Sequence, residues 1–242
     1  MPIIDSHAHC GLSLPLERIK PLWEKGAIEG GVLFSPVEEI YERFDGAFVD
    51  SPAYRESREN VHRYLQSVKS GLTFIFWFVW NDFKTPGEEF SGIKWHRHIG
   101  EPLYLYGTRE CDQLIEHICT RRLPVILEEE FARTREMVKT FNGRTVTIIP
   151  HCGNLNGGYV QLKKAGLFED PAVYVDTSLA SPQQIEDFAN TYGTERILFG
   201  SDFPFGNPVE ECAKVKRLFS GEERQKVLGE NLLDLLQKGK NN

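Results

Sequence analysis

Eight apolar, strand-like runs alternate with helical patterns along this chain of 242 residues, and this alternation constrains the fold more than any other feature. The run from Leu72 to Trp80 is almost continuously apolar, which is typical of parallel strands covered on both faces. The pattern predicts one domain over residues 1–242 with the α/β architecture of a (β/α)8 TIM barrel. The strand-like runs are residues 2–9, 27–34, 72–80, 90–98, 123–130, 145–151, 172–177 and 196–202.

Helices are expected after most of these runs, and two of them have clear start signals. Ser51-Pro52 and Ser181-Pro182 each place an N-cap residue before a proline at the first helical position. Residues 37–50 are expected to form a lid or a short helix, residues 81–89 a polar loop, and Asn241 and Asn242 part of a frayed tail. The expected helices are residues 14–25, 52–68, 108–120, 133–142, 159–168, 181–192, 208–219 and 222–236.

A doubly wound open sheet is the main alternative fold. Such sheets usually have a glycine-rich phosphate loop after the first strand, whereas here the first strand runs into histidines.

Charge and composition limit the partners of the chain. The net charge of -7 and the pI of about 5.6 argue against binding to nucleic acid or to an anionic membrane, so a small-molecule substrate is expected. No run of about 18 apolar residues predicts a transmembrane helix, and no signal-peptide pattern is visible. The five cysteines are scattered, which predicts a reducing, cytoplasmic location; homo-oligomer formation stays open.

A pair of histidines follows the first apolar residues of the chain. His7 and His9 are two residues apart, so on a strand they lie on one face, about 6 to 7 Å apart along it. Two imidazoles in that arrangement suit one divalent metal ion. From this pair alone, a polar turn after a strand is an equally good interpretation.

Other side chains with useful chemistry fall at the expected carboxyl ends of later strands, where the chemistry of a barrel collects. The other two histidines, His62 and His117, lie in helical patterns and are expected to be structural. The strand-end residues are Lys94, His96 and His98 on the fourth strand, Glu128 and Glu130 on the fifth, His151 on the sixth and Asp202 on the eighth.

Four segments together resemble the amidohydrolase superfamily. Within it, they resemble the amidohydrolase-related branch that includes aminocarboxymuconate-semialdehyde decarboxylase and related lactonases and hydrolases. Each segment alone is weak evidence for this family. All four together, in this order and on these strands, are specific for it. The segments are Asp5-Ser6-His7-Ala8-His9, Gly92-Ile93-Lys94-Trp95-His96, Ile149-Pro150-His151-Cys152-Gly153 and Phe199-Gly200-Ser201-Asp202-Phe203-Pro204.

The resemblance implies a distorted (β/α)8 barrel with one divalent ion. The ligands would be His7, His9, a residue of the fifth strand and Asp202, and zinc is favoured, with manganese or iron as alternatives. Members of this branch usually have a histidine at the end of the fifth strand, where this chain has Glu128. A carboxylate can also bind zinc, so we predict Glu128 as a ligand. The alternative is that Glu128 to Glu130 only open the next helix.

The remaining roles follow from the chemistry of such a centre. Asp202 is predicted to accept the proton of the attacking water, and His151 to donate a hydrogen bond to the oxyanion that forms. Lys94 and His96 are predicted to orient the substrate, and His98 to line the mouth. A carbamylated lysine, as in some related hydrolases, is not expected of this branch; an ion pair between Lys94 and Glu128 is the alternative.

Several functions fit these residues. The first is a metal-dependent hydrolase that acts on an amide, ester or lactone bond of a small molecule. The second is a metal-dependent, non-oxidative decarboxylase of an unsaturated or aromatic acid, for which Arg97 is the nearest candidate to hold the carboxylate. A barrel that has lost its metal and acts as a binding protein is a third. A deoxyribonuclease ranks last, because the chain lacks the glutamate motif that such nucleases have on the fourth strand.

Overall fold

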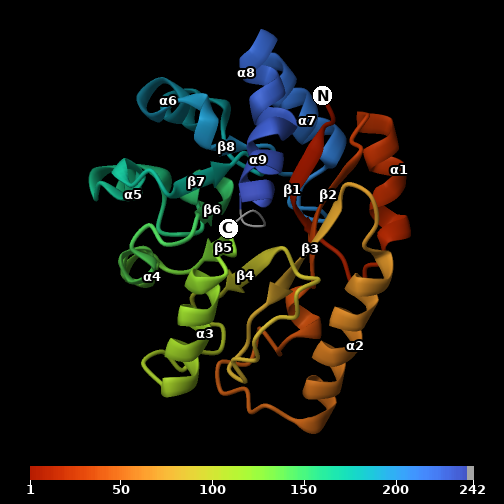
Figure 1. Ribbon diagram of the computed structural model, residues 1–242, viewed down its shortest axis with the longest axis vertical. Coiled ribbons are helices and arrows are strands. Elements are labelled where there is room, and N and C mark those ends of the chain that lie inside the picture. Colours follow the sequence, from red (N-terminus) through yellow and green to blue (C-terminus); the bar gives the residue numbers. More distant parts are fainter. Residues whose placement is uncertain (239–242) are drawn as a thin grey trace.

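The computed structural model describes residues 1–238, which form a parallel eight-stranded barrel surrounded by helices (Figure 1). The strands are ordered around the barrel as they occur in the chain, so the predicted (β/α)8 barrel is confirmed. The predicted tail at Asn241 and Asn242 lies outside the described residues. The strands are β1 (Ile4–His9), β2 (Gly30–Phe34), β3 (Thr73–Phe78), β4 (Gly92–His96), β5 (Val125–Glu128), β6 (Thr147–Ile149), β7 (Val173–Asp176) and β8 (Ile197–Leu198).

The barrel closes between its last and first strands, although β8 is only two residues long. The amide of Ser6 donates to the carbonyl of Phe199 at 2.7 Å. Farther along, the amide of Asp202 donates to the carbonyl of His7 at 2.7 Å, and the amide of His9 donates to that of Phe203 at 2.9 Å. The segment after β8 thus continues along β1 and places Asp202 next to the histidine pair.

The helices agree with the expected pattern in most places. Ser51 and Ser181 accept hydrogen bonds from the first turns of α2 and α6, as their position before proline predicts. Two expectations are refined: the helix expected at 222–236 is interrupted by a π-helical turn at Lys226–Glu230, and residues 37–50 contain only a short 3-10 turn, Val37–Glu39. The helices are α1 (Leu16–Gly26), α2 (Pro52–Val68), α3 (Arg109–Thr120), α4 (Phe131–Phe141), α5 (Tyr159–Lys164), α6 (Pro182–Tyr192), α7 (Pro208–Leu218), α8 (Gly221–Gln225) and α9 (Asn231–Lys238).

The inside of the barrel is a packed apolar layer at the end where the strands begin. Helix α9 lies near the middle of the ring of strands in Figure 1 and packs on this layer, closing that end. Gly92 lies beside the Phe76 ring, and a Cβ there would be 2.4 Å from it, so the glycine makes room for the ring. The layer consists of Ile4, Val32, Phe34, Phe76, Ile126, Ile148, Leu198, Leu232, Leu235 and Leu236.

The outer surface of the barrel packs against the helices in a larger apolar core. This core includes all five cysteines, and each of them is a buried free thiol. Within residues 1–238, none of the helices combines the length and the apolar character that crossing a bilayer requires.

His62 on α2 is a structural histidine, as predicted, because its ring stacks on Trp77 with centroids 3.7 Å apart and is 5% exposed. Burial, helped by the positive charges of Arg58 and Lys84, lowers the pKa of His62 to about 3. Between pH 6.5 and about pH 3, His62 is therefore protonated in the unfolded chain but neutral in the folded chain, so acid favours unfolding.

From this pKa shift we expect His62 to account for about 2 kcal/mol of lost stability between pH 7 and pH 5. The variant His62→Phe keeps the aromatic stacking on Trp77 and removes the titration. Urea unfolding of both proteins at the two pH values measures the effect. Equal losses in the two proteins would contradict it.

Candidate metal centre

A bulge in β1 turns His7 and His9 into the barrel. Between Asp5 and Ala8 the register of β1 against β2 shifts by one residue. Ile4 packs inside the barrel, and three residues later His7 also points inside, which strict alternation along a strand does not allow. The bulge therefore lets an apolar layer and a histidine pair share one side of the same strand.

The two histidines present Nε2 to the same oxygen of Asp202. The Nε2 atoms of His7 and His9 lie 3.3 and 3.4 Å from Asp202 Oδ1. On the other side of each ring, Nδ1 of His7 is 2.8 Å from Asp176 Oδ2, and Nδ1 of His9 is 3.1 Å from the carbonyl oxygen of Ser35. These partners fix the rings and direct Nε2 inward, as the outer partners of metal-binding histidines do.

His151 adds a third imidazole with the same orientation. Its Nδ1 lies 3.1 Å from the carbonyl oxygen of Ser178, which can only accept, so this nitrogen carries the hydrogen and Nε2 faces the centre. The residue follows β6 in a turn and has a φ of 57°, a left-handed conformation that is unusual for histidine. Asp176 Oδ1 accepts the backbone amide of His151 at 3.0 Å and holds this turn. One carboxylate thus positions both His7 and His151.

Asp202 also lies on a left-handed backbone, with a φ of 53°. The neighbouring amide of Ser201 donates to Asp5 Oδ1 at 2.8 Å, which anchors the turn to β1. Although burial opposes ionisation, the two histidines hold the pKa of Asp202 well below its usual range, so its carboxylate is charged at neutral pH. A strained turn that holds a buried charge is typical of a functional site.

The pKa values of the two β1 histidines differ for physical reasons. Burial lowers the pKa of His9, which keeps its ring neutral. Burial and Lys94 also disfavour a charge on His7, yet Asp176 and Asp202 outweigh them and raise its pKa to about 9. A cation at this place would take over the role of that proton in balancing the two carboxylates.

The group of His7, His9 and Asp202 fits a divalent cation. Ligand atoms about 2.0 to 2.2 Å from zinc, at angles between a right angle and a tetrahedral angle, are about 3.0 to 3.5 Å apart. The distances of 3.3 and 3.4 Å from the two Nε2 atoms to Asp202 Oδ1 lie in this range. His7, Glu128 and His151 form a second group whose ligand atoms lie within 4.8 Å of one another. His7 belongs to both groups, so the two groups adjoin at this residue.

Glu128 lies in this centre but is held by other partners. Its Oε2 accepts from Lys94 Nζ at 2.8 Å and is 3.8 Å from His151 Nε2. Its Oε1 is 2.5 Å from His98 Nε2 and 3.4 Å from His96 Nε2. Burial raises the pKa of this carboxyl, but Lys94 and His96 more than offset it, so the pKa lies well below the usual range. The structure places Glu128 facing the centre, and its role as a ligand stays a prediction.

Lys94 forms the ion pair with Glu128 that the sequence offers as an alternative to a substrate contact. The side chain is fully buried, and its ammonium lies 4.7 Å from the centroid of the Phe34 ring. Nζ is 3.4 Å from His7 Nε2. The ammonium thus balances the charge of Glu128 at the edge of the centre.

His96 and His98 belong to a polar network that the sequence did not indicate. Glu101 Oε1 accepts from Arg43 at 2.8 Å, and Glu101 Oε2 accepts from the Tyr41 hydroxyl at 2.9 Å. Arg43 Nη2 also lies 3.3 Å from His98 Nδ1. Burial lowers the pKa of His96 to about 4, so this ring is neutral at pH 7. Arg43 and Glu101 lie in loops without a periodic pattern, and only their charge marks them in the sequence.

Arg97 does not face the centre. It is the neighbour of two inward-facing histidines, so alternation along the strand turns it outward, where it pairs with Glu129 and Glu130. Glu130, named with Glu128 as a strand-end candidate, also points away from the centre, because β5 ends at Glu128 and Glu130 is already the N-cap of α4. The arginine that a decarboxylase would need is therefore not Arg97.

A cavity of about 160 Å³ lies over the centre. Polar groups of the centre form its floor, and apolar side chains form much of its walls. Arg43 is the arginine that lines it. The lining residues are His9, Val37, Arg43, His96, His98, Glu128, Leu155, Leu179, Asp202 and Phe205.

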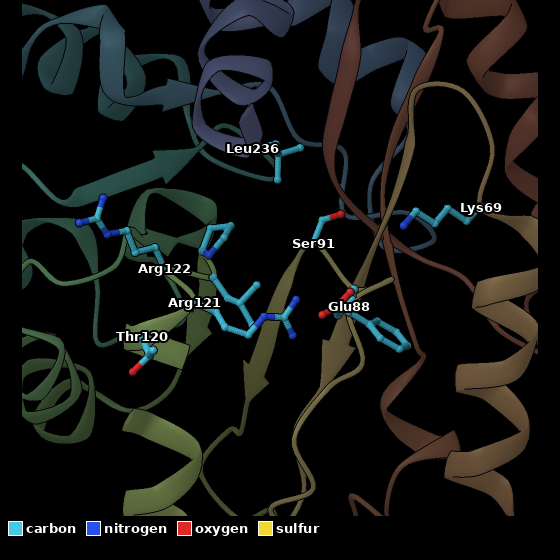
Figure 2. Close-up of a pocket in the computed structure, with 10 residues that line it drawn as sticks. Lys69, Glu88, Ser91, Thr120, Arg121, Arg122 and Leu236 are labelled. Atoms are coloured by element: carbon cyan, nitrogen blue, oxygen red, sulfur yellow. The ribbon is translucent and has the colours of Figure 1, made fainter. Parts of the chain in front are cut away.

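A second cavity, of about 350 Å³, lies at the opposite end of the barrel, where β4 and β5 begin (Figure 2). The guanidinium of Arg121 points into it and donates to the carbonyls of Pro86 and Gly87 at 3.1 and 3.3 Å. The arginine thus ties the end of α3 to the loop before β4, at the face of a barrel that usually serves stability.

Asp176 supplies a prediction that tests this arrangement. Replacing Asp176 by asparagine keeps the shape of the side chain but removes the charge that faces His7 Nδ1 at 2.8 Å. We expect zinc affinity to fall about 10- to 100-fold, the usual effect of losing an outer partner of a metal ligand. Competition with a chromogenic chelator measures this change. Unaltered zinc affinity would show that the charge of Asp176 does not support metal binding.

A model of the amidohydrolase family matches residues 92–237. No curated protein matches the chain. Many solved structures share this fold, and three of them are described below; at their sequence identities the likeness shows the fold alone.

The first of these is a 2,6-dihydroxybenzoate decarboxylase from Rhizobium, with 12% identity and a TM-score of 0.72 over 98% of this chain and 99% of that chain. An amidohydrolase 2 from Bifidobacterium longum subsp. infantis has 20% identity and a TM-score of 0.65 over 98% and 99%. A probable 2-pyrone-4,6-dicarboxylic acid hydrolase from Acinetobacter baumannii has 14% identity and a TM-score of 0.66 over 98% and 100%.

Proposed function

We propose, because the chain belongs to the amidohydrolase family, that it is a metal-dependent hydrolase that cleaves an amide, ester or lactone bond of a small molecule. One observation supports this above all others. His7 and His9, each fixed at Nδ1, present Nε2 within 3.4 Å of the same oxygen of the charged Asp202.

The metal in this proposal is a single divalent ion, with zinc favoured and manganese or iron as alternatives. His7, His9 and Asp202 would hold it, and Glu128 would complete the set. When bound, such an ion lowers the pKa of water toward about 7, so that hydroxide forms at neutral pH.

Two residues of the chain would carry out the other catalytic steps. Asp202 is ionised and buried at the floor of the cavity, so its carboxylate can accept the proton of water and pass it to the leaving group. Burial opposes a charge on His151, but Glu128 outweighs it and raises the pKa of His151, which favours a ring that donates from Nε2. That donor would stabilise the oxyanion on the attacked carbonyl.

Decarboxylation is the second candidate, and one observation favours it. Arg43 lines the cavity over the centre and could hold the carboxylate of an acid substrate, the role for which Arg97 is turned the wrong way. Arg43 already shares both Nε and Nη2 with Glu101, which weakens its ability to bind a second carboxylate. We therefore place hydrolysis first.

A substrate screen tests the proposal. The full chain, loaded with zinc or with manganese, is incubated with lactones, esters, amides and unsaturated or aromatic acids, and products are separated by mass. Metal-dependent hydrolysis of at least one class is the expected result. Release of carbon dioxide without hydrolysis would favour the second candidate, and no turnover by a fully loaded protein would overturn both.

A further inference from the structure

The cavity over the centre is small for a complete substrate. Its volume is about 160 Å³, and an engineered protein cavity of about 150 Å³ holds one benzene molecule. The cavity therefore accommodates the reacting group and roughly one ring. Any larger substrate must continue beyond it.

A groove of about 670 Å³ adjoins this cavity and offers that continuation. His98 and Leu155 line both spaces, so the cavity and the groove meet at these two residues. The groove passes between the residue after His98, the first turn of α4 and the loop after β6. Its lining residues are His98, Ile99, Glu130, Phe131, Ala132, Asn154, Leu155, Gly157 and Gln161.

The groove suits an uncharged, apolar occupant. Ile99 is 83% exposed and Leu155 is 45% exposed, so two large apolar side chains face water beside the cavity. Its one carboxylate, Glu130, is paired with Arg97, and no lysine or arginine is among the described residues that line it. A charged arm would therefore find no free counter-charge in the groove.

The walls of the groove are formed before anything binds. The loop after β6 is closed on itself by the amide of Gly158, which donates to the carbonyl of Gly153 at 2.9 Å. Asn156 Nδ2 donates to the carbonyl of Leu127 at 3.0 Å, which ties the loop to β5. A Cβ at Gly157 would lie 2.6 Å from Cβ of Phe131, so loop and helix are in direct contact there. Because its walls are already ordered, the groove can bind a ligand with little loss of conformational entropy in the protein.

We propose that the substrate has an extended, uncharged apolar arm, alkyl or aryl, which lies in the groove between Ile99, Ala132 and Leu155 while its reacting group occupies the cavity. This inference rests on the proposed function, because it takes the cavity as the place of reaction. It selects, among amides, esters and lactones, those with a long apolar substituent on one side of the scissile bond.

Straight-chain alkyl hydroxamic acids, from acetyl to decanoyl, test the arm without requiring turnover. Their head group binds metal, and calorimetry on the zinc-loaded full chain measures the dissociation constant of each. We expect acetohydroxamic acid to bind weakly and each further methylene in the groove to tighten binding up to about fourfold. No binding of any member, or affinity that does not depend on length, would overturn the proposal.

Two variants locate the arm. Ala132 is exposed on the first turn of α4, so Ala132→Trp is expected to fill the groove and remove the gain with length. Ile99→Glu places a charge in it and is expected to weaken the decanoyl compound at least tenfold. Lys139→Trp, on the last turn of α4 and away from the groove, is the matched control and should keep the gain.

Affinity for acetohydroxamic acid should be unchanged in all three variants, which shows that the centre is intact. If the decanoyl compound still binds Ala132→Trp and Ile99→Glu as tightly as the parent protein, the arm lies elsewhere and the proposal is wrong. The hydrolysis screen tests the proposed reaction separately. If binding depends on chain length but no hydrolysis occurs, the groove still binds the apolar arm and only the proposed hydrolase activity is wrong.

Discussion

Asparagine in place of Asp202 is expected to lower kcat by at least about 1000-fold while the barrel stays folded. The carboxylate is placed both to hold the cation with His7 and His9, at 3.3 and 3.4 Å, and to accept the proton of water. Loss of a general base alone costs about 100- to 10,000-fold, and loss of a metal ligand adds to that. Asparagine has nearly the same shape, so the turn that Ser201 and Asp5 anchor should remain.

The measurement is kcat and KM on the best substrate of the screen, together with the thermal unfolding midpoint and the metal content of each protein. Asp187→Asn is the matched control, because Asp187 is a surface aspartate on α6 that pairs with Lys163. Its activity should equal that of the parent protein. If Asp202→Asn turns over at more than a tenth of the parent rate, Asp202 has no part in the mechanism.

Removal of the metal is expected to abolish turnover and to destabilise the protein. A ligand at 1000 times its dissociation constant stabilises the folded state by about 4 kcal/mol. For a chain of this size each kcal/mol corresponds to about 2 to 4 °C, so the unfolding midpoint should fall by about 8 to 16 °C after chelation. One equivalent of zinc or manganese should restore both the midpoint and the activity.

Elemental analysis should find one divalent ion per chain in the parent protein and less than about a tenth of an equivalent when His7 and His9 are both replaced by alanine. His117→Ala on α3 is the control for loss of a histidine outside the centre and should keep its metal. Well under half an equivalent in the parent protein, even after reconstitution, would favour the third function, a barrel that binds without metal.

Much of the architecture was predictable because it depends on local patterns. Alternating strand-like and helical segments predicted the barrel, and the Ser-Pro pairs at residues 51–52 and 181–182 correctly marked the starts of α2 and α6. Strand boundaries were less accurate: the eighth strand was expected at 196–202 but is only Ile197–Leu198. The barrel is closed there by backbone hydrogen bonds of an irregular segment, and such a segment has no periodic signal.

The candidate site was predictable to the extent that it lies at strand ends. His7, His9, Glu128, His151 and Asp202 were found by residue type and position, and the structure brings all five to one end of the barrel. Their assigned roles stay predictions. The partners that orient His7 and His151 were not found, because Asp176 and Ser178 are ordinary polar residues whose importance depends on what lies opposite them.

The fold class, the family resemblance and the side chains available for chemistry follow from the sequence, because periodicity and residue type are local properties. Which of these side chains face one another depends on the packed structure. It shows that a bulge in β1 turns His7 and His9 inward, that Arg97 faces away while Arg43 from a distant loop lines the cavity, and that Asp176 supports two histidines at once. These outcomes depend on register shifts and on contacts between distant residues, such as His7 and Asp176, which are 169 positions apart, and no local pattern encodes them.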